Sequence, residues 1–316
     1  MPELRRLRQF VVLAEELHFG RAAKRLSMTQ PPLSMQIRNL EEEVGAQLFF
    51  RTKRHVALTG AGEVLLTEAR RILALMDRAF AMTERAGRGE IGSLRIGFVS
   101  TADYSLLPPL LLEFRKRYPE INLSLRELTT DAQLRAFADG DLDVGFVVAP
   151  IDDADTDYET IFSEPLVAAL PEAHALARSE GPVAVRALAN EGFISSPRAT
   201  APYHYDKILA FTEAAGFTPR IEQVAVQMQT IVSLVSAGLG VAIVPACMRN
   251  LQRSGVVYRD LHPSTPIFQT AIAWPKKNRS VILEQFVDVA REHSHFVSPS
   301  TLSARGARLQ SGQPTP

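Results

Sequence analysis

The segment "SMTQPPLSMQIRNLEEEVG", Ser27 to Gly45, decides how the N-terminal part of this 316-residue chain folds. Leu33, Ile37, Leu40 and Val44 recur in it at intervals of four, three and four residues. This spacing places the four side chains on one face of an α-helix. The segment therefore predicts an amphipathic helix that begins directly behind two prolines.

Pro31 and Pro32 are suited to the first turn of that helix. The first N–H groups of a helix have no intrahelical partner, so a proline loses nothing there, and its fixed φ already matches the helix. Thr29 or Ser27 is expected to cap the helix. Without a long capping segment, the helix tip can press against another surface, and its positive dipole end favours phosphate.

The residues before this helix complete a recognisable motif. An apolar stripe predicts a helix over residues 4–17, and Ala22, Ala23 and Leu26 lie on one face of a short helix over residues 21–26. Three residues then connect to the proline-led helix. This is the pattern of a helix-turn-helix, with small residues where the helices cross. A buried three-helix motif with an ordinary proline start is the alternative.

The residues after the helix favour the first interpretation. Residues 48–50 and 56–58 read as two short β-strands joined by the basic loop 51–55. A charged loop usually forms a solvated turn. Directly after a helix-turn-helix, however, it forms a wing suited to phosphates or the minor groove. We therefore predict a winged helix.

A long helix is expected to begin at Thr59 and to end in the glycine-rich hinge of residues 86–93. Its apolar seam follows alternating steps of four and three residues, close to a heptad repeat, through Leu65, Ala69, Ile72, Met76, Ala79, Thr83 and Ala86. With so many small residues the seam could pack on its own domain. Dimerisation explains the length of the helix better, because one small winged domain does not need it.

Beyond residue 93 the pattern changes to alternating strands and helices, which predicts an α/β fold with a parallel sheet. Strands are expected at 94–99, 121–128, 142–148, 165–170, 191–195, 220–225, 240–245 and 268–274. Helices are expected at 105–118, 130–138, 203–215, 227–237 and 279–294. Two α/β lobes follow from this order, with crossovers near residues 148–150 and 271–274. The tail 296–316 has few large apolar groups and is expected to be disordered.

Composition limits the class of protein. Apolar residues make up 46% and charged residues 22%, as in soluble globular proteins. No apolar run reaches the roughly 18 residues of a membrane span, and the N-terminus lacks the pattern of an export signal. The single cysteine, Cys247, fits a reducing compartment, so we expect a cytoplasmic protein without membrane partners. Residues 1–59 carry ten basic and six acidic side chains, against 25 and 29 elsewhere, so the N-terminal end is the one suited to a polyanion.

Enzymatic function is not indicated. The sequence lacks the HExxH, GxSxG, GxxxxGK[ST] and paired CxxC patterns, and its seven histidines form no metal-ligand cluster. We expect no catalytic residues, no metal and no cofactor. A solute-binding module for transport is a second rival, since two lobes over residues 94–295 would fit it. The missing export signal and the N-terminal winged helix argue against that function.

The segment "AAKRLSMTQPPLSMQIRNLEEEVGAQLFFRTKRHVALTGAGE" resembles the N-terminal signature of LysR-type transcriptional regulators. "LRIGF", "GDLDVGFV" and "VSAGLGVAIVP" are similar to segments of the effector domain of that family. The resemblance covers essentially residues 4–295. It implies a winged helix-turn-helix, a dimerising linker helix and a two-lobed, periplasmic-binding-protein-like α/β domain. It also implies a homotetramer built as a dimer of dimers, with a small molecule between the lobes that alters DNA binding.

This resemblance divides the chain into a DNA-binding domain (2–59), a linker helix with hinge (60–89) and an effector-binding domain (94–295). The first lobe would comprise about 94–148 and 274–295, and the second about 165–268. The expected partners are double-stranded promoter DNA, a small carboxylate effector and further copies of the chain, with RNA polymerase as an additional candidate.

Several side chains at the proline-led tip and in the wing can contact DNA. Gln30 can contact an adenine edge in a bidentate way, and Arg38 is suited to anchoring the phosphate backbone. Pairing of Arg38 with Glu41 or Glu42 on its own helix is an equal alternative. Met35 stands where the family usually has a basic residue, and it offers only apolar contact. The candidate DNA-binding residues are Thr29, Gln30, Pro31, Pro32, Ser34, Met35, Gln36, Arg38, Lys53 and Arg54.

An effector is expected at the carboxyl ends of the strands, beside helix starts. Hydroxyl groups at two such places, with free N–H groups beside them, suit a small aromatic or unsaturated carboxylate. Ordinary helix capping is the alternative for each hydroxyl, and at least one of the second-lobe tyrosines is expected to serve packing only. The candidate effector-binding residues are Ser100, Thr101, Thr129, Thr130, Val148, Arg198, Tyr203 and His204.

Overall fold

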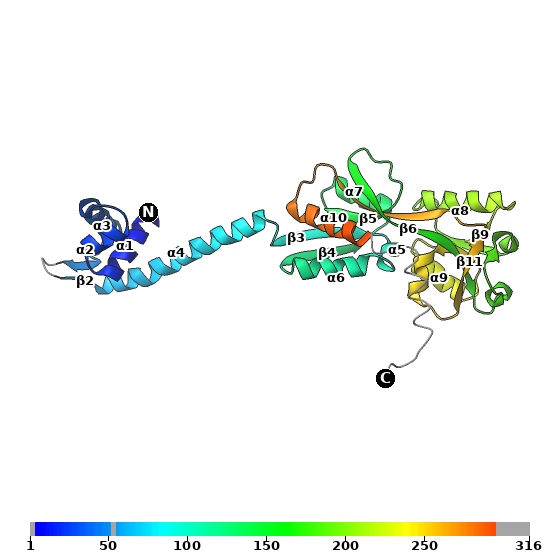
Figure 1. The fold of residues 1–316 in the computed structure, drawn as a ribbon, viewed down its shortest axis with the longest axis horizontal. Helices are drawn as coiled ribbons and strands as arrows, with labels where there is room; N and C mark the ends of the chain where they lie inside the picture. The colour runs from blue at the N-terminus through cyan, green and yellow to red at the C-terminus, as the bar shows by residue number, and fades with distance from the viewer. Residues whose placement is uncertain (1–3, 52–54, 295–316) are drawn as a thin grey trace, which may run out of the picture. The chain divides into compact units, whose positions relative to one another are not determined.

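The computed structural model describes residues 4–51 and 55–294, which form two compact units divided between Gly87 and Arg88 (Figure 1). The N-terminal unit contains α1 (Leu4–Glu16), α2 (Phe19–Arg25), α3 (Gln30–Val44), β1 (Phe49–Arg51), β2 (Val56–Leu58) and α4 (Gly60–Gly87). The predicted tail 296–316 lies outside the described residues.

The N-terminal unit is a helix-turn-helix followed by a two-stranded antiparallel wing, as predicted. Leu33, Ile37 and Leu40 of α3 are completely buried and pack in one core with residues of α1 and α2. Gly45 ends α3 in the left-handed conformation, with φ 73°, and its N–H donates to the carbonyl of Glu41 at 2.9 Å. The apolar spacing and this glycine stop therefore fix both the face and the length of α3.

Thr59 joins the wing to α4. Its hydroxyl donates to the carbonyl of Gln47 at 2.6 Å and accepts from the N–H of Gly62 at 3.0 Å, which caps the helix. A Cβ atom at Gly62 would lie 2.2 Å from the carbonyl oxygen of Leu48, so only glycine allows this close approach.

The two alternatives for the seam of α4 apply to different parts of the helix. Ala69 is completely buried and Leu65 packs against the same core, so the first turns of α4 belong to the head. Further along, Ile72, Leu75 and Met82 are exposed. The later turns of α4 therefore present an apolar face that no described residue of this chain covers.

Within the described residues, the C-terminal unit contains one extended sheet and a separate two-stranded sheet, together with α- and 3₁₀-helices. Its strands are β3 (Gly92–Phe98), β4 (Ile121–Glu127), β5 (Val144–Val148), β6 (Thr156–Pro171), β7 (Val183–Ala184), β8 (Gly192–Ser195), β9 (Arg220–Val224), β10 (Ala242–Pro245), β11 (Val256–His262) and β12 (Ile267–Pro275). Its helices are α5 (Ser100–Asp103), α6 (Leu107–Arg117), α7 (Thr130–Ala138), η1 (Ala175–Arg178), η2 (Val185–Leu188), α8 (Pro202–Ala214), α9 (Met228–Ser236), η3 (Ala246–Leu251) and α10 (Val281–Ser294).

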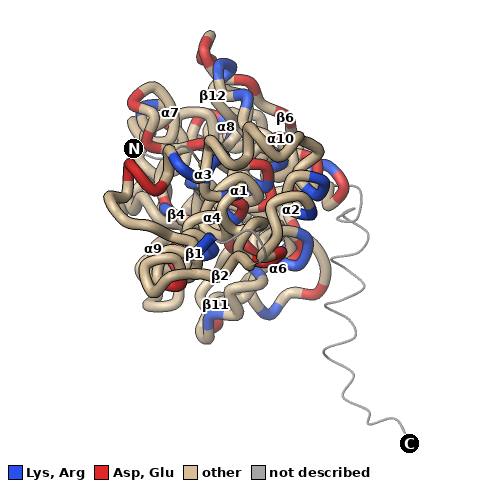
Figure 2. The backbone as a smooth tube through the Cα atoms, turned by 90° about the vertical axis from the view of Figure 1, so that its left-hand side faces the viewer, with Lys and Arg blue, Asp and Glu red and all other residues tan. Residues whose placement is uncertain are grey.

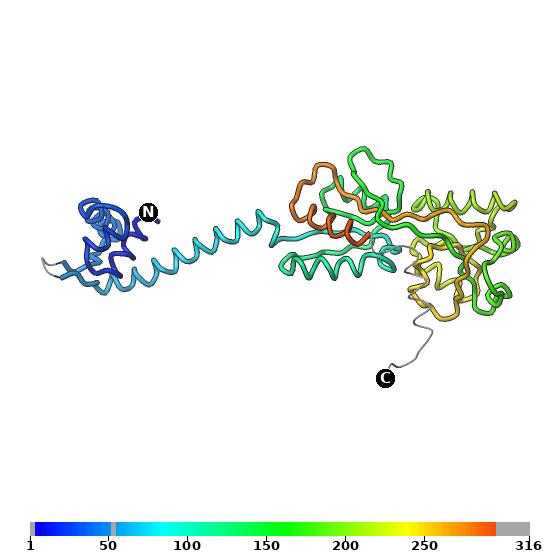
Figure 3. Tube along the Cα trace, viewed as in Figure 1, coloured from blue at the N-terminus to red at the C-terminus, as the bar shows by residue number. Residues whose placement is uncertain are grey.

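The main sheet has the strand order β4-β3-β5-β12-β6-β11-β7, with β10 also paired to β6. Strand β3 runs parallel to β4 and β5, whereas β12 and β6 pair antiparallel. The sheet is therefore mixed rather than purely parallel, because β6 and β12 run in opposite directions between the lobes. Figure 3 shows these two segments, green and orange, crossing from one lobe to the other.

Each lobe has its own apolar core, which confirms the two-lobed α/β fold class. The first is centred on Leu94, Phe146 and Phe286, and the second includes Leu166 and Phe268. The first-lobe core also contains Ile161, Phe162 and Ile272, which lie outside the ranges expected for that lobe. The reason is that β6 and β12 are long crossing strands, each of which contributes to both cores.

Candidate functional site

The tip of α3 is held by its buried face, which leaves the opposite face exposed. Thr29 is the N-cap residue in extended conformation, but its hydroxyl makes no capping hydrogen bond. Gln30 and Pro31 are exposed, and Met35 retains 53% of its accessible surface. Pro31 and Pro32 have no N–H groups, so the first turn leaves few backbone donors unsatisfied if the tip is covered by another molecule.

Two polar residues of α3 have partners within the head. The guanidinium of Arg6 on α1 donates to Oε1 of Gln36 at 2.9 Å and pairs with Glu43 at 2.8 Å. Gln36 is half-buried and helps to hold α1 against α3. Ser34 is also half-buried, and its hydroxyl accepts a long contact of 3.5 Å from Arg38.

Arg38 pairs with neither of the acids considered for it. The carboxylate of Glu41 instead accepts hydrogen bonds from the N–H groups of Leu48 and Phe49, at 2.9 and 3.2 Å, and pairs with Arg51. This fixes the base of the wing to α3 and leaves the exposed guanidinium of Arg38 with only Ser34 as a partner in the described chain. Lys53 and Arg54, the predicted wing contacts, lie outside the described residues.

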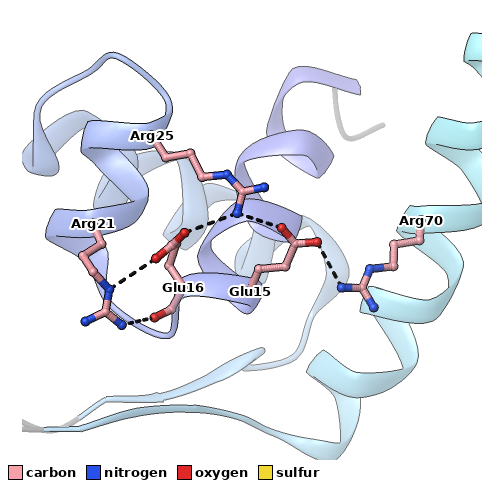
Figure 4. Close-up of polar contacts among 5 residues, drawn as sticks. All are labelled: Glu15, Glu16, Arg21, Arg25 and Arg70. Atoms are coloured by element: carbon pink, nitrogen blue, oxygen red, sulfur yellow. Dashed lines mark hydrogen bonds and ion pairs between the residues drawn. The ribbon is translucent and has the colours of Figure 1, made fainter.

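Other arginines of the head are neutralised within it (Figure 4). Glu15 on α1 pairs with Arg25 of α2 at 2.9 Å and with Arg70 of α4 at 3.0 Å. Glu16 pairs with Arg21 and Arg25 at 3.2 and 3.3 Å. The hydrogen bond from Arg70, followed by that from Arg25, holds the pKa of Glu15 below its ordinary value. The network joins three helices, and its arginines are therefore poorly placed to contact a polyanion.

Figure 2 marks the basic and acidic positions along the backbone. Arg5 and Lys24 are exposed and have no hydrogen bond or ion pair within residues 4–51 and 55–294. Sequence analysis did not name either residue. Their helical positions outside the apolar stripes indicated exposure, but only the structure shows which neighbouring arginines are already paired.

The C-terminal unit contains a cavity of about 220 Å³ between its lobes. It lies where β3, β4 and β5 end and where α5, α7, α8 and α9 begin. Most of its wall is apolar, and this part is formed by Val99, Leu128, Leu134, Val148, Ile151, Ala201, Val226, Met228 and Phe268.

Seven of the eight predicted effector residues line this cavity: Ser100, Thr101, Thr129, Thr130, Val148, Tyr203 and His204. The eighth, Arg198, does not. Its guanidinium donates to both carboxylate oxygens of Asp206, at 2.8 and 3.0 Å, on the exposed surface beside α8. This bidentate pair satisfies the cation outside the cavity.

Four buried polar atoms of the lining have no hydrogen-bond partner: Oγ1 of Thr101, Oδ1 of Asp131, Oγ of Ser196 and Nδ1 of His204. Burial lowers the pKa of His204 to about 4, so its imidazole is neutral at physiological pH. Its ring lies edge-on to Phe268, with centroids 5.4 Å apart. Because buried polar atoms are normally satisfied, these unpartnered atoms indicate a polar ligand or water in the cavity.

Sequence analysis missed Ser196, Gln227 and Phe268 in this wall. Gln227 is the N-cap of α9, a helix that was predicted from residue 227, so the rule that found Thr129 applied there as well. Ser196 directly follows β8 and met the same condition. Phe268 had no such signal, because its position depends on how β12 crosses between the lobes.

The cavity is suited to an anion with an apolar body. The N-termini of α7, α8 and α9 meet at its wall, and their partial positive charge favours a carboxylate. In the described part of the chain, no cluster of three His, Cys, Asp or Glu side chains could hold a metal ion. Over the same residues, no helix is both long and apolar enough to cross a membrane.

Two family models match separate parts of the chain. Residues 4–63 match the model "Bacterial regulatory helix-turn-helix protein, lysR family", and residues 87–295 match "LysR substrate binding domain". The HTH-type transcriptional regulator AlsR of Bacillus subtilis (strain 168) is 40% identical over 288 residues, which are 91% of this chain and 95% of AlsR.

Two solved structures are similar to this chain. Full-length CbnR complexed with target DNA has a TM-score of 0.80 and 28% identity, covering 92% of this chain and 99% of CbnR. The BenM effector-binding domain with its effector benzoate has a TM-score of 0.58 and 26% identity, covering 65% of this chain and 93% of that domain.

Proposed function

The chain belongs to the LysR family of transcriptional regulators, and from this premise we propose that a small aromatic or unsaturated carboxylate, bound between the lobes, modulates its binding to promoter DNA. The protein is a DNA-binding regulator with an effector-binding domain, and it is not an enzyme. The observation that carries the proposal is the cavity with three neutral, unpartnered polar atoms beside helix N-termini. We also propose that it acts in the cytoplasm, where promoters and RNA polymerase, a further candidate partner, are found.

The tip of α3 is proposed to enter the major groove. Gln30 is exposed at the first helical position, where its amide can form two hydrogen bonds with an adenine edge. Met35 is exposed five residues further on and can contact a thymine methyl group. Thr29 and Arg38 are proposed to contact phosphates, because the hydroxyl of Thr29 caps nothing and Arg38 has no acidic partner in the described chain.

Gln30→Ala is expected to lower affinity for the specific operator by about 1–3 kcal/mol while leaving non-specific binding nearly unchanged. Arg38→Ala is expected to weaken binding to all sequences and to reduce the slope of log K against log salt by about one. Quantitative gel shifts over a salt series, with the DNA upstream of the coding region as the specific probe, measure both effects. Equal losses on specific and random DNA for Gln30→Ala would contradict a base contact.

For the effector, Thr101→Val is expected to weaken carboxylate binding about five- to twentyfold, because it removes one buried hydroxyl without changing the shape of the side chain. Arg198→Ala provides the control, since the Arg198 side chain lies outside the cavity wall. Calorimetric titration of both variants with benzoate and crotonate gives the measurement. A strong loss in Arg198→Ala, with no change in Thr101→Val, would place the site elsewhere.

The exposed apolar stripe of α4 supports a homodimer through this linker helix, and we propose a homotetramer of two such dimers. Ala79 and Ala81 are both exposed on α4, but helical geometry places them on opposite sides, with only Ala79 in the seam. Ala79→Glu is expected to raise the dimer dissociation constant at least tenfold, whereas Ala81→Glu leaves it unchanged. Sedimentation equilibrium tests this pair, and equal effects of the two variants would refute the seam.

A further inference from the structure

The charged side chains at the cavity are both acidic. Asp131 and Asp152 belong to its lining, together with hydroxyls, an imidazole and the amide of Gln227. Of the lining residues that the structure describes, none is Lys or Arg. Burial raises the pKa of Asp131, but hydrogen bonds from Thr129 and Arg135 outweigh it and leave the pKa below its usual value. Asp131 is therefore ionised at neutral pH.

Apart from Oδ1 of Asp131, which is buried without a hydrogen-bond partner, the groups available to bind a ligand are neutral. Thr101, Ser196 and His204 are 3%, 1% and 3% exposed, and each has one polar atom without a partner. The ammonium of Lys207 lies 4.4 Å from the ring centroid of the lining residue Tyr203, and it donates a hydrogen bond to the carbonyl of Ile267. Recognition in this cavity therefore depends on hydroxyls, a neutral imidazole and helix N-termini.

Such a site can accept one negative charge but not two. Hydrogen bonds and helix N-termini can replace the hydration of a single carboxylate. A second carboxylate would lose its hydration without gaining a cation from the lining. It would be repelled by Asp152 and by the unpartnered Oδ1 of Asp131, whose Oδ2 pairs with Arg135 at 2.9 Å. Size gives a second limit, because an apolar cavity of about 150 Å³ accepts benzene, so one of about 220 Å³ holds a body close to one ring.

We infer that the effector is a monocarboxylate with an apolar body of about one ring, and that dicarboxylates of the same shape are rejected by the charge of the cavity. This inference rests on the proposed function, since it assumes that the cavity is the effector site. It goes further by naming the net charge of the ligand and the two residues that enforce it.

Matched ligand pairs test the inference on the full-length protein. Benzoate is compared with phthalate, and crotonate with fumarate, by titration calorimetry at pH 8, where each second member carries two charges. We expect each monocarboxylate to bind at least tenfold more tightly than its dicarboxylate partner. Equal or tighter binding of phthalate or fumarate would overturn the inference while leaving a carboxylate effector in place. If no carboxylate binds, the inference and the proposed function both fall.

Two aspartates in one exposed loop provide matched variants. Asp152 lines the cavity, whereas Asp155, three residues further on, does not. Asp152→Asn is expected to reduce the preference for benzoate over phthalate about threefold, and Asp155→Asn is expected to leave it unchanged. The same preference in both variants and the unmodified protein would overturn the role of Asp152 in charge selection.

Discussion

Replacing Phe10 by alanine is expected to unfold the N-terminal unit and to abolish promoter binding. Phe10 is completely buried in α1, its ring centroid lies 5.4 Å from that of Phe49, and both belong to the core that contains Leu33 and Ile37 of α3. Truncating a buried phenylalanine costs about 3–5 kcal/mol. This is most of the stability of a domain of this size, which lies near the lower end of about 5–15 kcal/mol.

Phe50→Ala is a control of the same chemistry, one residue beyond the aromatic partner of Phe10. Phe50 keeps 61% of its accessible surface, so its truncation leaves no cavity in the core and should change stability by about 0.5 kcal/mol or less. Urea unfolding of the full-length variants, followed by hydrogen exchange in α1 and α3, separates the two cases. Similar protection in Phe10→Ala and Phe50→Ala would show that α3 is not held by this core.

The success of the sequence analysis at α3 has a physical reason. The spacing of Leu33, Ile37 and Leu40 alone predicts that they lie on the buried face of a helix, and the prolines mark where this helix begins. The head is built from local elements of this kind, so periodicity and end signals are sufficient. What they could not give is side-chain pairing between elements, such as that of Gln36 with Arg6, because it depends on how the helices pack.

In the C-terminal unit, the wrong predictions also concern elements that depend on distant parts of the chain. The helix expected over 105–118 corresponds to α6, but the short helix α5 before it and β11 (Val256–His262) were not predicted. Strand β6 begins at Thr156, nine residues before the expected start, because its first half pairs with β12 rather than showing a local apolar run. Elements that are defined by distant partners leave only a weak signal in their own sequence.

The residues of the candidate effector site also differ in how well the sequence predicts their role. Thr101, Thr129 and Thr130 could be named because the end of a strand next to the start of a helix is a local pattern, and the topology then brings these ends together. Arg198 was also a reasonable candidate from its chemistry. Its pairing with Asp206, eight residues away and across a turn, could not be seen in sequence. A cation can therefore be proposed from sequence, but whether it is free for a ligand depends on the fold.

Gly145→Ala is expected to destabilise the C-terminal unit by about 2–5 kcal/mol and to abolish effector binding. A Cβ atom at Gly145 would lie 2.1 Å from Oε1 of Gln133 and 3.0 Å from Phe137. Gln133 is completely buried, and its Nε2 donates to the carbonyls of Leu128 and Phe146 at 3.0 and 2.9 Å. It cannot move away without giving up these two buried hydrogen bonds, each worth about 1–3 kcal/mol when lost.

The loss of effector binding follows from the position of Leu128, which lines the cavity immediately before the start of α7. A double-mutant cycle tests whether Gln133 is the obstacle. In a Gln133→Ala background the clash with Oε1 is gone, so Gly145→Ala should cost at least 1 kcal/mol less than in the unmodified protein. Gly60→Ala, at a glycine with no atom within 4 Å of an added Cβ, should be nearly neutral. Urea unfolding measures the free energy of unfolding in both backgrounds. If Gly145→Ala lowers it equally in both, the limiting contact is Phe137 and Gln133 is not the obstacle.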